Sequence, residues 1–260
     1  MEMSWIDSHH DVMGFEEAWL CHVLQSVREK HGKEIAENFG VEVLIPSRPF
    51  PKVTMEDAQK ILQDKGYVAP ADTKIGDIDP QGERLLCEYS REQYGHEFIF
   101  VTDYPAEVRP FYHMRKEDNP TETKSFDLLW KWMEITTGAQ REHQYEILVK
   151  QATEKAISLE SIQFYLDFFK YGCPPHGGFG FGLARLLAAI SWMRAIVSAS
   201  RRNRRVASAS SAAEPLRAAA GPADAPMDPT EVDTVIWLSP ADACACVDSD
   251  GITVPTTRRP

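Results

Sequence analysis

Apolar positions along residues 1–190 follow two different patterns, and these predict a mixture of helices and strands. In several segments apolar residues recur every three to four positions, as the buried face of a helix requires. Two other segments, 98–102 and 108–114, are short and apolar like buried strands, although Pro110 interrupts the second. The helices expected from the pattern cover residues 13–39, a short segment after Thr54, 81–93, 141–155 and 159–171.

Three local features refine this outline. Thr54 stands where a helix cap is expected, with Asp57 three residues later as a capping-box acid. Phe164, Phe168 and Tyr171 lie on one face of the expected helix over 159–171, and we expect this stripe to pack in the core. Pro46–Pro51 is expected to be a connector, and Gly66–Asp79 a loop.

The order of these elements predicts an α+β fold with an antiparallel sheet flanked by helices. The composition changes after residue 190. A run of arginines at 201–205 precedes a segment rich in Ala, Ser, Pro and Gly, which cannot bury enough apolar surface to offset the entropy of ordering. We therefore expect one folded domain over 1–190 and a divergent, disordered tail over 191–260.

The strongest candidate for chemistry is residues 124–141, where Asp127, Glu134 and Arg141 follow one another at seven-residue spacing. On one straight strand two residues seven apart point to opposite faces, so the acids converge only if the chain turns near Trp130-Lys131. Such a hairpin would bring both carboxylates together, with Arg141 nearby as a fork for a substrate carboxylate. Two carboxylates without Cys or His suit Mg²⁺. An amphipathic hairpin with solvated acids is the equally supported alternative.

A second candidate is the glycine-rich segment 177–182, which alternates glycine with aromatic residues. Glycine leaves no side chain in the way, so a strand there can lie close to a flat group. A helix is expected from Leu183, with Arg185 in its first turn able to hold a phosphate or stack on a base. The spacing matches neither a dinucleotide-binding nor a P-loop motif, and a bulge or tight turn is the alternative.

Several motifs in the same order resemble class II aminoacyl-tRNA synthetases of the aspartate, asparagine and lysine group, in particular archaeal-type aspartyl-tRNA synthetases. The resemblance covers residues 1–190 and implies the α+β fold predicted above. The motifs that carry it are Phe-Val-Thr-Asp-Tyr-Pro-Ala-Glu-Val-Arg-Pro-Phe-Tyr (100–112), Lys-Ser-Phe-Asp-Leu-Leu (124–129), Glu-Ile-Thr-Thr-Gly-Ala-Gln-Arg (134–141) and Pro-Pro-His-Gly-Gly-Phe-Gly (174–180).

The resemblance implies a role for each candidate residue. Asp127 and Glu134 correspond to acids that hold Mg²⁺ and orient ATP, and Thr137 to a small hydroxyl residue near the metal and the amino acid. Arg141 corresponds to the arginine that reads the side-chain carboxylate of aspartate, and His176 to a histidine beside the amino acid.

The segment that the resemblance assigns to class II motif 3 is Gly182, Leu183, Ala184 and Arg185. It implies ATP binding there, with Arg185 on adenine or the γ-phosphate, so that Arg141 and Arg185 are the implied catalytic residues. The implied reaction activates aspartate with ATP and transfers it to tRNA, mostly by positioning and charge neutralisation. The family is homodimeric.

Departures from the family pattern lead to a narrower expectation. Trp130-Lys131-Trp132 replaces a short, often glycine-containing turn, and Ala184 replaces the glutamate before the motif 3 arginine. Met1–Asp7 resembles the end of the strand that closes motif 2. We therefore expect a fragment without motif 1, the motif 2 arginine and the anticodon-binding domain, with weak adenylate formation on its own. We also hypothesise that a frameshift, a splicing difference or a faulty gene model explains the tail.

Two other functions remain open: a non-catalytic, synthetase-like remnant or regulatory module, and a synthetase-related asparagine synthetase. The net charge of −11 provides no overall basic field, so contact with tRNA would need a local patch. The five cysteines show no metal-ligand spacing and favour a reducing compartment. Neither a cleavable signal nor a long apolar span is visible, so we expect a cytoplasmic protein without membrane contact. His9-His10-Asp11 suggests a metal site or, more simply, the solvated start of a helix.

Overall fold

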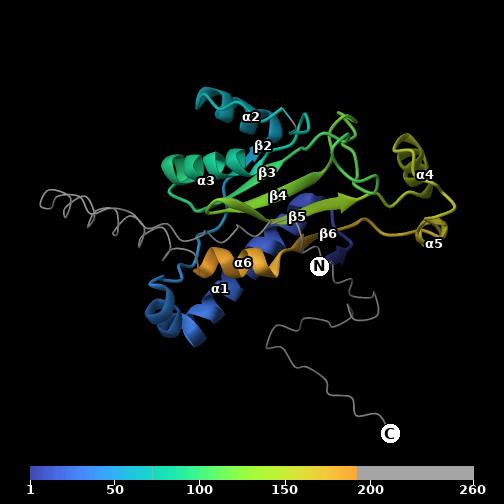
Figure 1. The fold of residues 1–260 in the computed structure, drawn as a ribbon. Coiled ribbons are helices and arrows are strands. Elements are labelled where there is room, and N and C mark those ends of the chain that lie inside the picture. The colour runs from blue at the N-terminus through green and yellow to red at the C-terminus, as the bar shows by residue number, and fades with distance from the viewer. Residues whose placement is uncertain (72, 192–260) are drawn as a thin grey trace, which may run out of the picture. The chain divides into compact units, whose positions relative to one another are not determined.

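The computed structural model describes residues 1–71 and 73–191, all within the first of the chain's two structural units, Met1–Ser211. The tail predicted over 191–260 therefore lies outside the described residues from 192 onward. Within the described part, six strands form one sheet in the order β1-β6-β5-β4-β3-β2 (Figure 1). The strands are β1 (Glu2–Ser4), β2 (Lys52–Thr54), β3 (Phe98–Thr102), β4 (Ser125–Trp130), β5 (Met133–Arg141) and β6 (His176–Phe181).

The sheet is antiparallel except between β2 and β3, which run parallel. Helices cover both faces (Figure 1). On one face lie α1 (His9–Phe39) and α6 (Leu183–Ser191), and on the other α2 (Met55–Asp64) and α3 (Pro80–Tyr94). The predicted α+β architecture is confirmed, with one parallel pair at the edge strand β2.

Two apolar clusters fill the layers on either side of the sheet. Phe100, Phe126 and Leu128 pack with α1 and α6, whereas Ile99 and Leu129 pack with α2 and α3. Neighbouring residues of one strand thus belong to different clusters, because successive side chains of a strand point to opposite faces. The β3 strand is buried on both faces, which explains its continuous apolar sequence.

The helix starts follow from capping residues. Ser8 and Asp11 form a capping box, so α1 begins at His9, four residues earlier than its apolar period indicated. The Asp11 carboxylate accepts the backbone N–H groups of Asp7 and Ser8. In the described ranges no group of three or more His, Cys, Asp or Glu is placed to hold a metal, and His9-His10-Asp11 is the start of a helix. Thr54 caps α2 as predicted.

The predicted strand over 108–114 is wrong. These residues form turns, in which Val108 N–H donates to Pro105 and His113 N–H to Pro110. Pro110 lacks an N–H and cannot complete a strand ladder, so the segment becomes a loop with only isolated bridges to its neighbours.

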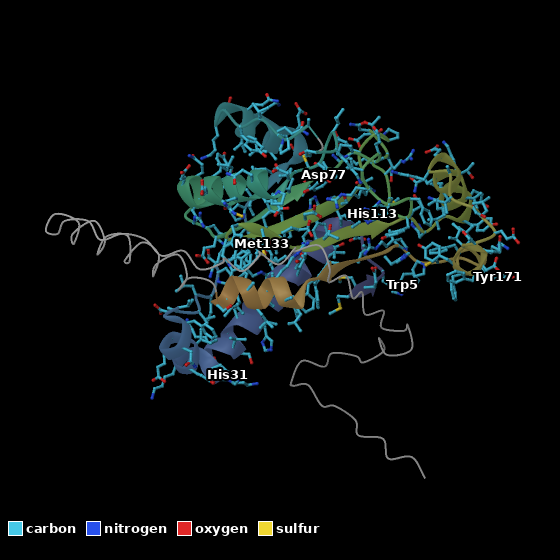
Figure 2. The ribbon with its side chains drawn as sticks, viewed as in Figure 1. Trp5, His31, Asp77, His113, Met133 and Tyr171 are labelled. Carbon is cyan, nitrogen blue, oxygen red and sulfur yellow. The ribbon has the colours of Figure 1, made fainter. Side chains whose placement is uncertain are left out.

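The two helices predicted after residue 141 are shorter than expected. Arg141 ends β5, and α4 starts only at Tyr145 (Tyr145–Glu154), while α5 covers just Gln163–Asp167. The predicted core stripe is also wrong, since Phe164, Phe168 and Tyr171 are 72%, 72% and 92% exposed. Leu166 and Phe169 are buried in their place, with Ile162 packed against them, so the inward face lies two positions away from the predicted stripe, on the opposite side of the helix. Tyr171 lies at the outer end of this region in Figure 2.

Glycine is required where β1 meets β6. A Cβ on Gly178 would lie 2.0 Å from the Met1 carbonyl oxygen, so only glycine permits this close approach. None of the helices in residues 1–71 and 73–191 combines the length and the apolar character that a membrane crossing requires.

Candidate active site

The two acids of the predicted hairpin lie on the same face of the sheet. β4 and β5 form the hairpin, with Lys131 at its turn in the left-handed region at φ 63°. Asp127 pairs with Thr137, and Leu129 pairs with Glu134, because a bulge shifts the register after Leu128. The extra residue on β5 brings Glu134 opposite Leu129, two positions from Asp127 and therefore on its face. The bulge, together with the turn, makes the carboxylates converge.

Asp127 is buried and its carboxylate is fully engaged. Thr137 Oγ1 donates to Oδ1, and Arg109 Nη2 donates to Oδ2. Arg109 also donates to Thr137 Oγ1 at 3.1 Å and lies over the Tyr104 ring at 3.6 Å from its centroid. The guanidinium of Arg109 therefore neutralises a carboxylate that burial alone would make costly.

Glu134 lies between a cation and another acid. Arg185 Nη1 donates to Glu134 Oε1 at 3.0 Å and to the Glu134 carbonyl at 3.2 Å. The Glu134 backbone N–H donates to Glu83 Oε2 at 2.8 Å. Burial and the nearby Asp127 charge raise the pKa of Glu134, and burial raises the pKa of Glu83 to about 7. The site concentrates more negative charge than its arginines compensate.

These residues fit a hard cation. Asp127 and Glu134 offer carboxylate oxygens and Thr137 a hydroxyl, and Mg²⁺ in proteins commonly uses one or two carboxylates together with substrate phosphates. A bound cation would relieve the charge repulsion that raises the pKa of Glu134. Arg109 and Arg185 supply positive charge to Asp127 and Glu134.

The segment 182–185 links β6 to α6 at this end of β5. Gly182 N–H donates to the Ile135 carbonyl at 3.0 Å, which fixes the start of α6 against the bulge. Leu183 and Ala184 are exposed in the first turn, and Arg185 extends from it to Glu134. The segment thus brings one arginine to the carboxylates, and the structure shows no acid where Ala184 stands.

Arg141 lies at the other end of β5 rather than beside the acids. It is four positions from Thr137, which is about 13 Å along a strand. Its Nε and Nη2 donate to Glu2 Oε1 at 3.1 and 2.7 Å, and Nη2 also donates to the Gly178 carbonyl at 3.2 Å. His113 Nε2 lies 3.0 Å from Nη1. Figure 2 shows the two ends of the strand well apart, with Met133 labelled at one and His113 near the other.

His176 belongs to the Arg141 end, where it pairs with Arg141 across β5 and β6. Its Nδ1 lies 3.1 Å from the Pro174 carbonyl and 3.7 Å from Cys173 Sγ, and its ring stacks on Phe169. Burial lowers the pKa of His176, which favours a neutral ring. Thr137 contacts Asp127 and Arg109, so the predicted aspartate-binding residues divide between the two ends.

Four contacting residues were missed by the sequence interpretation: Arg109, Glu83, Glu2 and His113. A signal existed only for Arg109, which lies in the motif at 100–112. Glu83 and Glu2 come from distant helix and strand positions, and no local pattern marks them.

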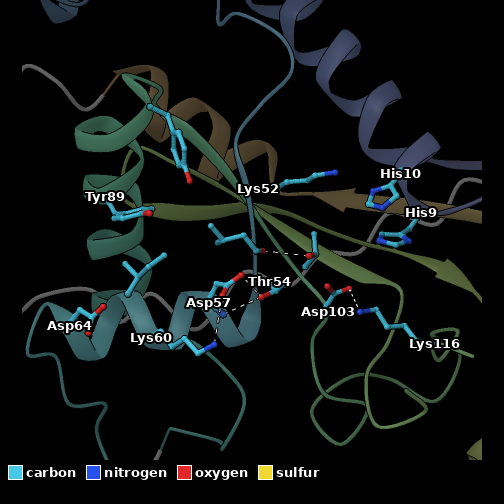
Figure 3. Close-up of a pocket in the computed structure, with 14 residues that line it drawn as sticks. His9, His10, Lys52, Thr54, Asp57, Lys60, Asp64, Tyr89, Asp103 and Lys116 are labelled. Atoms are coloured by element: carbon cyan, nitrogen blue, oxygen red, sulfur yellow. Dashed lines mark hydrogen bonds and ion pairs between the residues drawn. The ribbon is translucent and has the colours of Figure 1, made fainter. Parts of the chain in front are cut away.

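A separate cavity of about 620 Å³ lies beside the edge strand β2, near the starts of α1 and α2 (Figure 3). Of the candidate residues, His9 and His10 line it, whereas none of the residues predicted to bind aspartate, ATP or Mg²⁺ does. Lys60 pairs there with Glu56 and Asp57, and Lys116 pairs with Asp103. Three lysines and three aspartates line it, so the charges of its lysines and aspartates are equal and opposite.

Comparison with known proteins defines the class. Residues 1–200 match the family description "tRNA synthetases class II (D, K and N)". The chain therefore belongs to the class II aminoacyl-tRNA synthetases of this group.

Within that family the chain is similar to archaeal aspartate–tRNA ligases. It is 43% identical over 188 residues to the aspartate–tRNA(Asp/Asn) ligase of Aeropyrum pernix, covering 72% of this chain and 42% of the relative. It is 44% identical over 186 residues to the aspartate–tRNA(Asp) ligase of Pyrococcus abyssi, again covering 72% of this chain and 42% of the relative. The chain thus spans about two-fifths of the length of these relatives.

Solved structures agree with this placement. Aspartyl-tRNA synthetase from Entamoeba histolytica superposes with a TM-score of 0.67 at 28% identity, over 74% of this chain and 40% of that one. Asparaginyl-tRNA synthetase from Pyrococcus horikoshii with asparaginyl-adenylate gives 0.65 at 30% identity, over 74% and 43%. The six-stranded sheet with its helices is therefore part of the fold of these enzymes.

Proposed function

We propose that this chain carries the aspartate, ATP and Mg²⁺ site of an aspartate–tRNA ligase. The proposal rests on how charged side chains are arranged along β5. The carboxylates and Arg185 lie at one end of the strand, and Arg141 lies at the other. A substrate with phosphates at one end and a carboxylate at the other matches this polarity. The same proposal assigns residues 1–190 to one catalytic-type domain.

At the first end, Asp127, Glu134 and Thr137 would hold Mg²⁺, and Arg185 would contact the phosphates or adenine of ATP. The metal, when bound, neutralises phosphate charge. Gly182, Leu183 and Ala184 shape the turn from which Arg185 extends, so their role is to position that side chain against Glu134. Arg109, which donates to Asp127, would add positive charge at this end.

At the second end, Arg141 would bind the side-chain carboxylate of aspartate, with His176 beside it. A guanidinium that faces a neutral amide is left partly unpaired, which favours aspartate over asparagine. The charge at the Arg141 end is compatible with this, since Glu2 already provides a carboxylate partner there. Transfer of the activated amino acid to tRNA is part of the proposal because the relatives named above are tRNA ligases.

The test is aspartate binding to the full chain, measured by calorimetry in the presence of ATP and Mg²⁺. Arg141→Ala should weaken aspartate binding about 100-fold, the usual effect of truncating one partner of a charge pair. Arg28→Ala, an exposed arginine of α1, is the matched control and should bind as the wild type does. Equal aspartate affinity in wild type and Arg141→Ala would refute the assignment.

ATP–pyrophosphate exchange separates catalysis from binding alone. Aspartate-dependent exchange that Arg141→Ala abolishes would support a ligase. Binding of aspartate and ATP without exchange would support the non-catalytic, synthetase-like module. Ammonia-dependent asparagine formation without tRNA would support the asparagine synthetase.

A further inference from the structure

The guanidinium of Arg141 is held on three sides, and its donors can be counted. Arginine carries five N–H groups. Glu2 Oε1 accepts from Nε and Nη2, the Gly178 carbonyl accepts from Nη2, and His113 Nε2 lies 3.0 Å from Nη1. Within the described residues, one Nη1 hydrogen remains without an acceptor. The edge formed by Nε and Nη2, which a carboxylate prefers, is already occupied by Glu2.

The two side chains that hold this guanidinium differ in burial. His113 is 3% exposed, whereas the Glu2 side chain is 51% exposed. Glu2 stands on the three-residue edge strand β1 and can turn into solvent at little cost. The His113 backbone is fixed, because its N–H donates to Pro110 and its carbonyl accepts from Gln151 Nε2.

We propose that His113 is the positioning residue of Arg141, and that Glu2 is an exchangeable carboxylate whose place the substrate side-chain carboxylate takes. The proposal rests on the aspartate site proposed above. His113 keeps Nη1 in place while Glu2 leaves, so the Nε–Nη2 edge is presented to the substrate in a fixed orientation. The substrate then receives a preorganised, bidentate donor pair.

The chemistry of His113 suits a permanent acceptor. Its charged neighbours are cations, namely Arg141, Arg109 and Lys155, and together with burial they lower its pKa well below the usual value. The ring therefore stays neutral with Nε2 unprotonated and the proton on Nδ1. A neutral acceptor holds the guanidinium without neutralising its positive charge, which attracts the substrate carboxylate. Glu2 does cancel that charge, which is why it must be the group that leaves.

The experiment compares His113→Leu, His113→Gln and Glu2→Gln in the full chain by calorimetry with L-aspartate, and separately with ATP. Leucine removes the acceptor, whereas the glutamine amide oxygen can replace Nε2. We expect His113→Leu to weaken aspartate binding about tenfold or more, since a hydrogen bond to a charged group is lost. ATP affinity should stay within about twofold of wild type, and His113→Gln should restore aspartate affinity to within about threefold.

Glu2→Gln tests the second half of the proposal. An amide competes more weakly than a carboxylate for the guanidinium, so aspartate should bind severalfold more tightly. Weaker aspartate binding in Glu2→Gln would overturn the exchange. Equal losses in His113→Leu and His113→Gln, or a parallel loss of ATP affinity, would show that His113 is only structural.

A ligand-free measurement separates this proposal from the proposed function. Rotation of the Arg141 guanidinium is measured by NMR, without substrate, in wild type, His113→Leu and His113→Gln. Slow rotation in wild type and His113→Gln, with faster rotation in His113→Leu, supports positioning even if aspartate does not bind. In that case the proposed function alone has failed. The same rotation rate in all three proteins would overturn the role of His113.

Discussion

The two ends of β5 carry charges of opposite sign, and each end is neutralised by side chains from other segments. At the Glu134 end, carboxylates gather and arginines from a loop and a helix neutralise them. At the Arg141 end, one partly buried guanidinium is neutralised by a carboxylate from an edge strand. At each end one compensating group is an exposed side chain: Arg185 and Glu2 are more than half exposed. These two counter-ions can exchange with solvent or substrate, whereas Arg109, the counter-ion of Asp127, is largely buried and fixed.

The largest expected effect is at the buried pair. Asp127→Ala leaves Arg109 buried without its carboxylate, which should reduce the free energy of unfolding by about 3–5 kcal/mol. Urea unfolding measures it. Asp167→Ala removes an exposed ion pair with Lys170 and should leave the midpoint nearly unchanged. A small effect of Asp127→Ala would mean that the Glu134 end is solvated and that the comparison between the two ends fails.

The second effect concerns the apolar support of the Arg141 end. Phe169 is buried and stacks on His176, so Phe169→Ala should cost about 3 kcal/mol in unfolding free energy. The neighbouring Phe168 is exposed, and Phe168→Ala should change stability by less than about 0.5 kcal/mol. Urea unfolding measures both variants. Equal losses of unfolding free energy would mean that Phe168 also packs in the core, as the sequence pattern predicted.

The third effect is the pH dependence that Glu83 contributes at the Glu134 end. The pKa of Glu83 rises from 4.5 to about 7 on folding, so between these values the unfolded chain loses a proton that the folded protein keeps. The contribution of Glu83 to stability therefore falls as pH rises from about 4.5 to about 7. Glu83→Gln should be more stable than wild type by about 2 kcal/mol at pH 8, allowing for partial exposure of the carboxyl.

The internal control for this prediction is pH 4, where both states of the wild-type carboxyl are protonated. There Glu83→Gln and wild type should unfold at the same urea concentration. A constant difference between the two proteins across the whole pH range would assign the effect to packing instead of charge.

The smallest expected effect on stability is at Arg185. Its ion pair with Glu134 is largely exposed, so Arg185→Ala should change the free energy of unfolding by less than about 1 kcal/mol. Because Arg185 is proposed to contact ATP, the variant should still bind ATP about tenfold more weakly in calorimetry with Mg²⁺. Unchanged ATP affinity would remove Arg185 from the proposed site, and a large loss of stability would contradict its status as an exchangeable counter-ion.

Much of the local structure was predictable because it depends on short-range chemistry. Thr54 caps a helix through its own hydroxyl, and the apolar run at 98–102 is a buried strand. The hairpin between Asp127 and Glu134, expected from a turn near Trp130-Lys131, is confirmed. Predictions failed where tertiary packing decides the outcome: Phe168 and Tyr171 fit a helical period, but the opposite face, with Leu166 and Phe169, packs inward.

The sequence by itself determined the family, the order of the elements and the identity of the strand residues Asp127, Glu134 and Arg141. Only the tertiary structure decided which groups they meet. Arg109, Glu83, Glu2 and His113 reach them from segments far along the chain, and a one-residue bulge turns Glu134 to the face of Asp127. The physical reason is that a side chain's partners depend on sheet register and loop closure, which no local pattern of residues specifies.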